Sequence, residues 1–373
     1  MRLTLLLLII VTCCHCTTKK ESTAIDKAGF KTIHFVDTSR SYKPGTDATN
    51  YLHYRPIDID VWYPADASAA ADSLLSIHDL LDLLEKRANY YTASNAGNGL
   101  AAQIAQLFCN GLKCSDSTKL LSFTTNSFEN AAAVKGKFPL VIYMTAFNGM
   151  SYENFTLFEA LAKKGFVVVS VSSIGSFPGD MTMKKQDLME QVNDAVFALK
   201  TLKTDPAIDP DKIGIIGYSW GGLAGVLLAG KIPGISCVVS LDGSEFHHYG
   251  DAKDENADFD NIKNSDDFKN LHLLMPYLRL ESSPATPTEK IDSVYNFSSE
   301  HTNKTQRIII DSAQHEDFGC MSLVVKASGN CNTGTRYQTI LKLVASFLDD
   351  HLQNANTFSN TLQQEMNKTI HKK

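Results

Sequence analysis

A serine between glycines at a strand-to-helix junction constrains this chain more than any other feature. The motif Gly217-Tyr218-Ser219-Trp220-Gly221-Gly222 follows an apolar run at 213–216 and opens an apolar helical segment at 221–228. A serine in that context adopts a strained turn, and small residues at Gly217 and Gly221 let neighbouring backbone approach without a clash. The turn exposes the Ser219 hydroxyl at the C-terminal edge of a sheet, with a helix N-terminus behind it. The motif therefore predicts a nucleophile elbow.

The pattern of the remaining chain predicts an α/β fold. Apolar runs with strand character alternate with segments in which apolar residues recur at helical spacing. The expected strands are 30–36, 57–61, 140–144, 166–171, 213–216, 237–241, 273–280 and 307–310. Apolar strands separated by amphipathic helices require a mostly parallel central sheet with helices on both faces. Within 57–61, Asp58 and Asp60 alternate with apolar residues, which predicts one solvent-facing side for that strand.

The composition along the chain indicates a single domain that is interrupted by insertions. We expect the domain over 30–353, with a helical insertion at about 66–132, where Ala, Leu, Ser and Asn dominate. Residues 243–270 are polar and acidic and too long for a plain connection, so they are expected to form a surface insertion near the site. A final helix uses apolar residues between 340 and 352, and the polar tail 354–373 is expected to fray at its end.

The N-terminus has the pattern of an export signal. Arg2 precedes an apolar run too short to span a membrane, and cysteines follow directly, so residues 1–16 are interpreted as a lipoprotein-like signal. Cleavage before Cys14, or before Cys13, would leave a lipid-modified cysteine on a polar tether at 17–29. This predicts a bacterial lipoprotein anchored on the periplasmic or cell-surface side. The alternative is an ordinary signal peptide and a secreted protein.

A serine hydroxyl needs a base and an acid to become a strong nucleophile. His315 lies on the loop after the last expected strand, whereas the other histidines after Ser219 lie in the polar insertion, at a strand start, or in the C-terminal helix and tail. Asp242 ends the strand that follows the elbow, and the tight turn Asp242-Gly243 would aim a short carboxylate at the site. Glu281, at the end of the next strand, is the alternative acid; otherwise it is an exposed residue opening a loop.

Ester or amide chemistry at a serine also needs two N–H donors for the oxyanion. One is expected from Trp220, the residue after the serine, and the other from Phe147, on the loop after the strand at 140–144. Both aromatic side chains would also wall the acyl pocket. Tyr152 and Phe155 could contribute to that wall, but core packing is the simpler role for them.

These residues resemble those of α/β-hydrolases, and in particular of platelet-activating-factor acetylhydrolases and dienelactone-hydrolase-like esterases. The matching segments are 55–65, 138–143, 165–168 and 209–222, followed by Asp242 and His315. The resemblance implies an acid after the strand that follows the elbow, which favours Asp242, and oxyanion donors at Phe147 and Trp220. The chain departs from the family at Thr145-Ala146, where His-Gly is usual, although a backbone donor survives that change.

Composition excludes several other classes of protein. The chain has 373 residues, of which 43% are hydrophobic and 20% charged, so it can bury a large core. A net charge of −6 argues against a general nucleic-acid binder. No Cys/His spacing indicates zinc. In an oxidising compartment Cys109 could pair with Cys114 and Cys320 with Cys331, whereas Cys237 is expected to be a buried free thiol.

We therefore expect a serine hydrolase of carboxylic esters that forms an acyl-enzyme and uses no metal or cofactor. Ser219 would attack, His315 would carry the proton and Asp242 would orient the imidazole. Its partners would be a small-molecule or lipid ester and, through the N-terminal lipid, a membrane; the sequence does not determine the oligomeric state. The alternatives are a serine peptidase of the same fold and a non-catalytic binding protein on the same scaffold.

Overall fold

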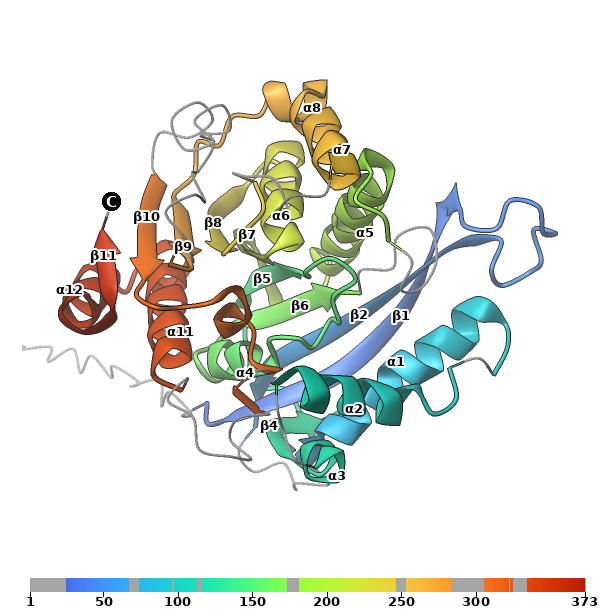
Figure 1. The fold of residues 1–373 in the computed structure, drawn as a ribbon, viewed down its shortest axis with the longest axis horizontal. Coiled ribbons are helices and arrows are strands. Elements are labelled where there is room, and N and C mark those ends of the chain that lie inside the picture. The colour runs from blue at the N-terminus through green and yellow to red at the C-terminus, as the bar shows by residue number, and fades with distance from the viewer. Residues whose placement is uncertain are drawn as a thin grey trace, which may run out of the picture.

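The computed structural model describes residues 25–66, 74–95, 97–112, 116–172, 181–245, 253–283, 305–321, 323–324 and 334–372. Within these ranges an 11-stranded sheet has the strand order β11-β10-β9-β8-β7-β5-β6-β2-β1-β4-β3 (Figure 1). The strands are β1 (Lys27–Ser41), β2 (Tyr54–Ala65), β3 (Leu74–Ser76), β4 (Thr124–Glu129), β5 (Phe138–Met144), β6 (Val167–Val171), β7 (Ile208–Tyr218), β8 (Ile235–Leu241), β9 (Tyr277–Glu281), β10 (Thr305–Ile310) and β11 (Ile370–Lys372). The helices are α1 (Ile77–Thr92), α2 (Leu100–Leu112), α3 (Ser117–Leu121), α4 (Phe155–Lys163), α5 (Lys185–Leu202), α6 (Trp220–Lys231), α7 (Lys253–Lys263), α8 (Asp266–Lys269), the 3-10 turn η2 (His315–Phe318), α11 (Gly334–Leu348), the π-helical turn η3 (Asp349–Gln353) and α12 (Phe358–Thr369).

The centre of the sheet is parallel, which confirms the predicted fold class. Strands β6, β5, β7, β8, β9 and β10 pair side by side in parallel. Ile215 of β7 packs into a core with α5 and α6, and Ile216 packs into a second core with α4 and α11. Because both faces are covered, most residues of these strands are apolar, although β9 also buries Arg279 and Glu281. Parallel strands also bring their C-terminal ends to one edge of the sheet, where the loops that carry chemistry meet.

The insertion at 66–132 is mostly helical, as predicted, and it also extends the sheet. Helices α1, α2 and α3 lie together on one side of the molecule (Figure 1). Strand β4 pairs in parallel with β1, and β3 pairs with β4. The alternation of short polar residues in β4 buries Thr125 and Ser127, a pattern too short and too polar to predict as a strand.

The prediction of a solvent-facing side for β2 is wrong. Asp60 is fully buried and Asp58 is only 6% exposed. Arg87, which comes from α1, donates to the two carboxylate oxygens of Asp60 at 3.0 and 2.7 Å and lies 3.5 Å from Asp58. A charged pair tolerates burial when it is matched and hydrogen-bonded. The inserted helix therefore covers the face that the alternation alone would leave to solvent.

Both expected tails are shorter than predicted. Strand β1 begins at Lys27, inside the segment expected to be a tether. In the segment expected to be a fraying tail, α12 buries Phe358 and Leu362, and β11 pairs with β10 as an antiparallel edge strand. The ring of Phe358 contacts that of Phe347 at 5.3 Å, so a few apolar residues on one face are enough to dock this helix.

The polar insertion at 243–270 is also more deeply packed than predicted. It contains α7 and α8, and Phe259 of α7 is fully buried in the core that includes α5. Lys263, near the end of α7, is 5% exposed, and its ammonium donates to the backbone carbonyl of Glu245. In the described part of this segment, Phe259, Ile262 and Phe268 are buried, whereas Asp254, Asp266 and Asp267 are exposed.

Several N-terminal and cysteine predictions fall on residues outside the described ranges. These are the signal at 1–16 with Cys13 and Cys14, and the partners Cys114 and Cys331 of the two expected disulfides. Cys237 is a fully buried free thiol, as predicted. Within the described ranges, no helix is both long and apolar enough to cross a membrane.

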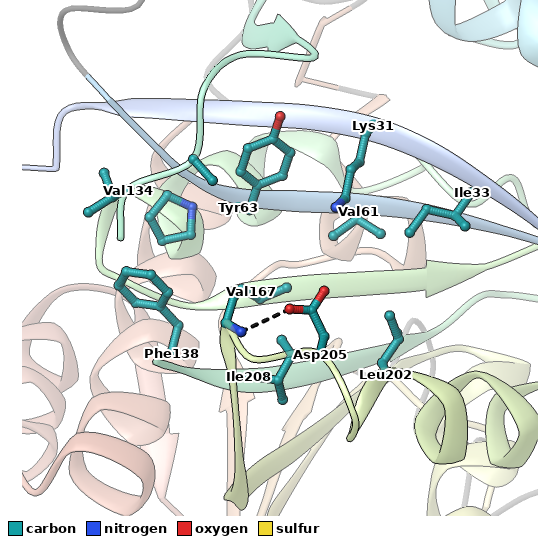
Figure 2. A pocket seen from close by; sticks show the side chains of 13 residues that line it. Lys31, Ile33, Val61, Tyr63, Val134, Phe138, Val167, Leu202, Asp205 and Ile208 are labelled. Atoms are coloured by element: carbon teal, nitrogen blue, oxygen red, sulfur yellow. Dashed lines mark hydrogen bonds between the residues drawn. The ribbon is translucent and has the colours of Figure 1, made fainter. Parts of the chain in front are cut away.

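A small cavity of about 60 Å³ lies at the N-terminal ends of the central strands, whereas the elbow lies at their C-terminal ends (Figure 2). Its lining includes Phe138, Val167 and Ile208, which lie at or near the starts of β5, β6 and β7. The Asp205 carboxylate at its side accepts the Ala207 N–H at 2.8 Å, the interaction drawn in Figure 2. Because Ser219 follows the opposite end of β7, this cavity is separate from the site described next.

Candidate active site

Ser219 occupies a strained turn between β7 and α6. Its φ of 55° and ψ of −122° lie outside the regions that most residues with a side chain adopt. Such a conformation costs about 1–3 kcal/mol and persists only where surrounding contacts hold it. The Ser219 N–H donates to the Leu241 carbonyl at 3.0 Å, and the Ser219 carbonyl accepts from Ser244 at 3.0 Å. The end of β8 therefore fixes the turn.

The glycines of the motif allow the elbow to pack closely on its neighbours. A Cβ at Gly217 would lie 2.1 Å from the carbonyl oxygen of Gly221. A Cβ at Gly221 would lie 2.0 Å from the carbonyl oxygen of Met144, the last residue of β5. Any larger residue at these two positions would push α6 away from β7 or from β5. The first turn of α6 is thus seated against the loop expected to supply an oxyanion donor.

The structure brings together the three residues that the sequence singled out. Nε2 of His315 lies 2.9 Å from Oγ of Ser219, and Nδ1 of His315 lies 2.7 Å from Oδ2 of Asp242. Ser219 and Asp242 follow β7 and β8, and His315 begins η2 after β10. The three side chains form a continuous hydrogen-bonded chain at the C-terminal edge of the sheet.

The electrostatics of the pair Asp242–His315 favour an ionised acid. Burial opposes ionisation of Asp242, but the hydrogen bond and charge of His315 and the Ser282 N–H outweigh it, so the Asp242 pKa lies below its ordinary value. The Ser282 N–H donates to Oδ1 at 2.8 Å. For His315, burial lowers the pKa, but the hydrogen bond and charge of Asp242 raise it above the ordinary value. An ionised Asp242 holds the proton on Nδ1 and leaves Nε2 as an acceptor toward Ser219.

Glu281, the alternative acid, has other partners. It is 6% exposed, not an exposed loop residue, and its carboxylate pairs with Arg307 and Arg279. The second carboxylate oxygen accepts from Nη2 of Arg307 at 2.7 Å. Two guanidinium groups thus hold Glu281 between β9 and β10. The imidazole of His315 pairs with Asp242 instead.

Tyr218, the residue before the serine, supports His315 from the side. The two rings stack with centroids 5.1 Å apart and an interplanar angle of 27°. The Tyr218 hydroxyl also donates to the His315 carbonyl at 3.1 Å. No role for Tyr218 was predicted from the sequence, although its place inside the motif was the signal that could have drawn attention to it.

The loop after β5 lies beside the elbow, as expected. The rings of Phe147 and Trp220 meet edge to face at 5.9 Å. Phe147 is partly buried, and Trp220 is fully buried in the core shared with α5, so the Trp220 side chain is a core residue and not a pocket wall. Trp220 opens α6, and the first N–H groups of a helix have no acceptor within the helix. Tyr152 and Phe155 are buried core residues, in line with the simpler of their two expected roles.

The loop after β5 has Thr145-Ala146 where His-Gly is usual in the family that the sequence resembles. Hydrogen bonds nevertheless hold this loop in a tight turn. Gln191 of α5 donates to the Thr145 carbonyl at 2.9 Å. The Gly149 N–H donates to the Ala146 carbonyl at 2.8 Å. Asn148, with a φ of 50°, completes the turn in the left-handed region that asparagine tolerates. The departure at Thr145-Ala146 therefore keeps a defined loop.

A buried carboxyl, Glu153, lies under the same loop and was not singled out from the sequence. Burial raises its pKa to about 7, against the opposing effects of the Ala146 N–H, the Tyr143 hydroxyl and the charge of His315. The only sequence signal was the polar pair Glu153-Asn154 at the start of an otherwise apolar helix. In the described part of the chain, no cluster of three or more His, Cys, Asp or Glu side chains could hold a metal ion.

Comparison with known proteins agrees with this architecture. Residues 127–265, which contain Ser219 and Asp242, match the dienelactone hydrolase family. A ferulic acid esterase from Streptomyces cinnamoneus has a similar fold, with a TM-score of 0.63 and 18% identity over 89% of this chain and 92% of that one. A search of curated proteins finds no match. The match to this family over residues 127–265 and the shared α/β-hydrolase fold indicate a hydrolase of ester bonds that resembles the dienelactone hydrolases.

Proposed function

We propose that the protein is a serine carboxylic-ester hydrolase that works through an acyl-enzyme. The observation that carries the proposal is the chain of hydrogen bonds from Ser219 through His315 to Asp242, mounted on a strained elbow. Nε2 of His315 takes the Ser219 proton as Oγ attacks the ester carbonyl, and then gives it to the leaving alcohol. Water then attacks the acyl-enzyme with His315 again as the base, which releases the carboxylic acid and restores Ser219.

Charge development on the carbonyl oxygen would be met by backbone donors. We assign these to the N–H groups of Phe147 and Trp220, because the loop after β5 and the first turn of α6 lie against each other at the elbow. Fixed N–H donors stabilise an oxyanion without reorganising during the reaction, and the loss of one such donor costs about 10²–10³ in kcat. The N-terminus of α6, which is the positive end of the helix dipole, also lies at Ser219.

A panel of substrates would identify the class of carboxylic ester. The structural neighbour is a ferulic acid esterase, and the sequence resembles phospholipid-directed acetylhydrolases. We therefore propose a panel of acyl esters of graded chain length, a hydroxycinnamate ester and a short-chain phospholipid. A peptide amide belongs in the same panel, because turnover of the amide alone would replace the esterase proposal with a peptidase.

The decisive test of the mechanism is Ser219→Ala. Wild-type protein should react with a fluorophosphonate probe and Ser219→Ala should not, because only an activated serine is labelled. With the best ester of the panel, the variant should lose a factor on the order of 10⁶ in kcat, as for other triad serines. Hydrolysis by a folded Ser219→Ala protein at a rate comparable to wild type would refute the proposal.

We also propose that the protein is exported and anchored by a lipid on Cys14 or Cys13. The support is the order of a short apolar run, cysteines and a polar segment at the N-terminus. An esterase held in this way would meet its substrates outside the cytoplasm.

A further inference from the structure

Two buried polar residues lie between the loops that the proposed chemistry needs. Glu153 and Asn154 immediately precede α4, and their exposures are 8% and 0%. Burying such groups is costly unless they are fully hydrogen-bonded. The side-chain partner of Ser219 is His315 and neither of these residues, and the Asn154 side chain makes no capping hydrogen bond to α4. Their partners therefore indicate what they do.

The side chain of Glu153 holds the loop after β5. Its Oε1 accepts the Ala146 N–H at 2.9 Å and the Tyr143 hydroxyl at 3.0 Å. Ala146 directly precedes Phe147, so this bond fixes the peptide next to the proposed oxyanion donor. A Cβ added to Gly149 would lie 2.5 Å from Oε2 of Glu153. The carboxyl group thus fills the inside of the turn.

The other contacts reach the segment that carries His315. The backbone carbonyl of Glu153 accepts the Cys320 N–H at 3.2 Å and lies 3.3 Å from Sγ of Cys320. The side-chain amide of Asn154 donates to the Phe318 carbonyl at 2.9 Å. Phe318 ends η2, the turn that begins with His315, and Cys320 follows two residues later. The Asn154 oxygen accepts the Tyr337 hydroxyl at 2.5 Å, which orients the amide.

We propose that Glu153 and Asn154 are positioning residues that hold the oxyanion loop and the histidine segment at fixed places on either side of Ser219. The inference rests on the proposed function, because it concerns how that site is aligned. The two loops lie far apart in the sequence, one after β5 and the other after β10. Glu153-Asn154 contacts both of them through a single dipeptide anchored on α4.

The physical reason is the precision that acyl transfer requires. The histidine must reach the serine proton while the N–H donors reach the carbonyl oxygen, and a displacement of about 1 Å in either can cost about 100-fold in rate. Loss of the clamp should therefore lower kcat while substrate binding, and hence KM, changes little. A residue that served folding alone would change stability and leave kcat of the folded enzyme near wild type.

The test uses two substitutions of nearly equal size at Glu153. Glu153→Gln keeps an oxygen that can accept from Ala146 and Tyr143, whereas Glu153→Met keeps the volume and removes the acceptor. We expect Glu153→Gln to retain kcat within about threefold and Glu153→Met to lose about 10- to 100-fold, with KM within about threefold of wild type. Near wild-type kcat in folded Glu153→Met would overturn the inference.

Glu159 provides the matched control. It is a second buried carboxyl, 3% exposed, on α4, but it accepts its hydrogen bonds from Asn126 and Ser127 of β4 instead of from the loop after β5. Glu159→Met should therefore lower stability and leave kcat unchanged. An equal loss of kcat in Glu159→Met and Glu153→Met would attribute both to general loosening of α4 and overturn the inference.

Two further arms keep the outcome decisive. If Glu153→Met does not fold, Asn154→Ala tests the other half of the clamp: about a tenfold loss of kcat supports the inference, and wild-type kcat overturns it. Ser219→Ala is measured in parallel. An active Ser219→Ala refutes the proposed function itself, whereas an inactive Ser219→Ala beside a fully active Glu153→Met refutes only the clamp.

Discussion

Replacing Asp242 by asparagine should disable the base without disturbing the fold. The Ser282 N–H donates to Oδ1 at 2.8 Å, and Nδ1 of His315 faces Oδ2 at 2.7 Å. In Asp242→Asn the Ser282 N–H still needs an acceptor, so the amide oxygen takes the Oδ1 position and the NH₂ group turns toward His315. Two donors cannot face each other, and the imidazole therefore moves its proton from Nδ1 to Nε2.

The size of the effect follows from that tautomer. With Nε2 protonated, His315 points a donor at Oγ of Ser219 across the same 2.9 Å, and it can no longer accept the serine proton. If the amide flips, the tautomer is restored, but the charge that stabilises the imidazolium is still absent and the Ser282 N–H is left against an NH₂ group. We expect kcat to fall by about 10³–10⁴. The upper figure corresponds to about 5 kcal/mol of lost transition-state stabilisation.

The assay compares Asp242→Asn with Glu281→Gln on one activated ester. Glu281→Gln should change kcat by less than about 10-fold. Because Glu281 pairs with Arg279 and Arg307, that variant should also unfold at lower urea concentration, so both proteins are assayed at a temperature where circular dichroism shows them folded. A mild loss in Asp242→Asn together with a large loss in Glu281→Gln would refute the assignment of the acid.

Three further predictions concern pH and location. Burial raises the pKa of Glu153 to about 7 from an ordinary 4.5; the folded protein therefore holds this proton more tightly than the unfolded chain, and stability should fall by about 2–3 kcal/mol between pH 5 and pH 8. Urea unfolding of Glu153→Gln should lack this fall, and an identical pH dependence in both proteins would contradict it. Burial lowers the pKa of His315, but the effect of Asp242 is larger and raises this pKa above its ordinary value. The rise of kcat/KM with pH should therefore have its midpoint above about 6.5; a midpoint clearly below 6 would count against His315 as the base. In a bacterium that processes lipoproteins, the full chain should partition into detergent and the double variant Cys13→Ala/Cys14→Ala should not; retention of the double variant would disprove the lipid anchor.

The site was predictable where it depends on neighbours in the sequence. Strand, serine turn and helix are consecutive, and the glycines at 217 and 221 reflect contacts that the elbow itself requires. The positions of Asp242 and His315 after later strands were also predictable, because parallel strands deliver the loops after them to one edge. The α/β fold followed from the same continuous apolar runs.

Other features depended on which segments meet in space. Alternating polarity in β2 indicated a wet face, but it could not show that Arg87 would come from the insertion to cover Asp60. The polarity of the tail predicted that its end would fray, yet two apolar residues on one face of α12 are buried, and one of them contacts α11. Asp242 directly follows β8 and Glu281 ends the adjacent strand β9, so both lie at the same edge of the sheet. The tight turn Asp242-Gly243 favoured Asp242 from the sequence, and the arrangement of the loops places Asp242, not Glu281, against His315.

The sequence by itself therefore determined the fold class, the elbow and the set of residues at the edge of the sheet. Each of these depends on local periodicity or on backbone geometry within a few residues. The sequence favoured Asp242 over Glu281 as the partner of His315, and the tertiary structure places Asp242 at that imidazole. The tertiary structure alone decided the contacts of Glu153 and Asn154 with two distant loops. Such contacts depend on distances between segments far apart in the chain, and a hydrophobic pattern specifies which face is buried without specifying which side chain covers it.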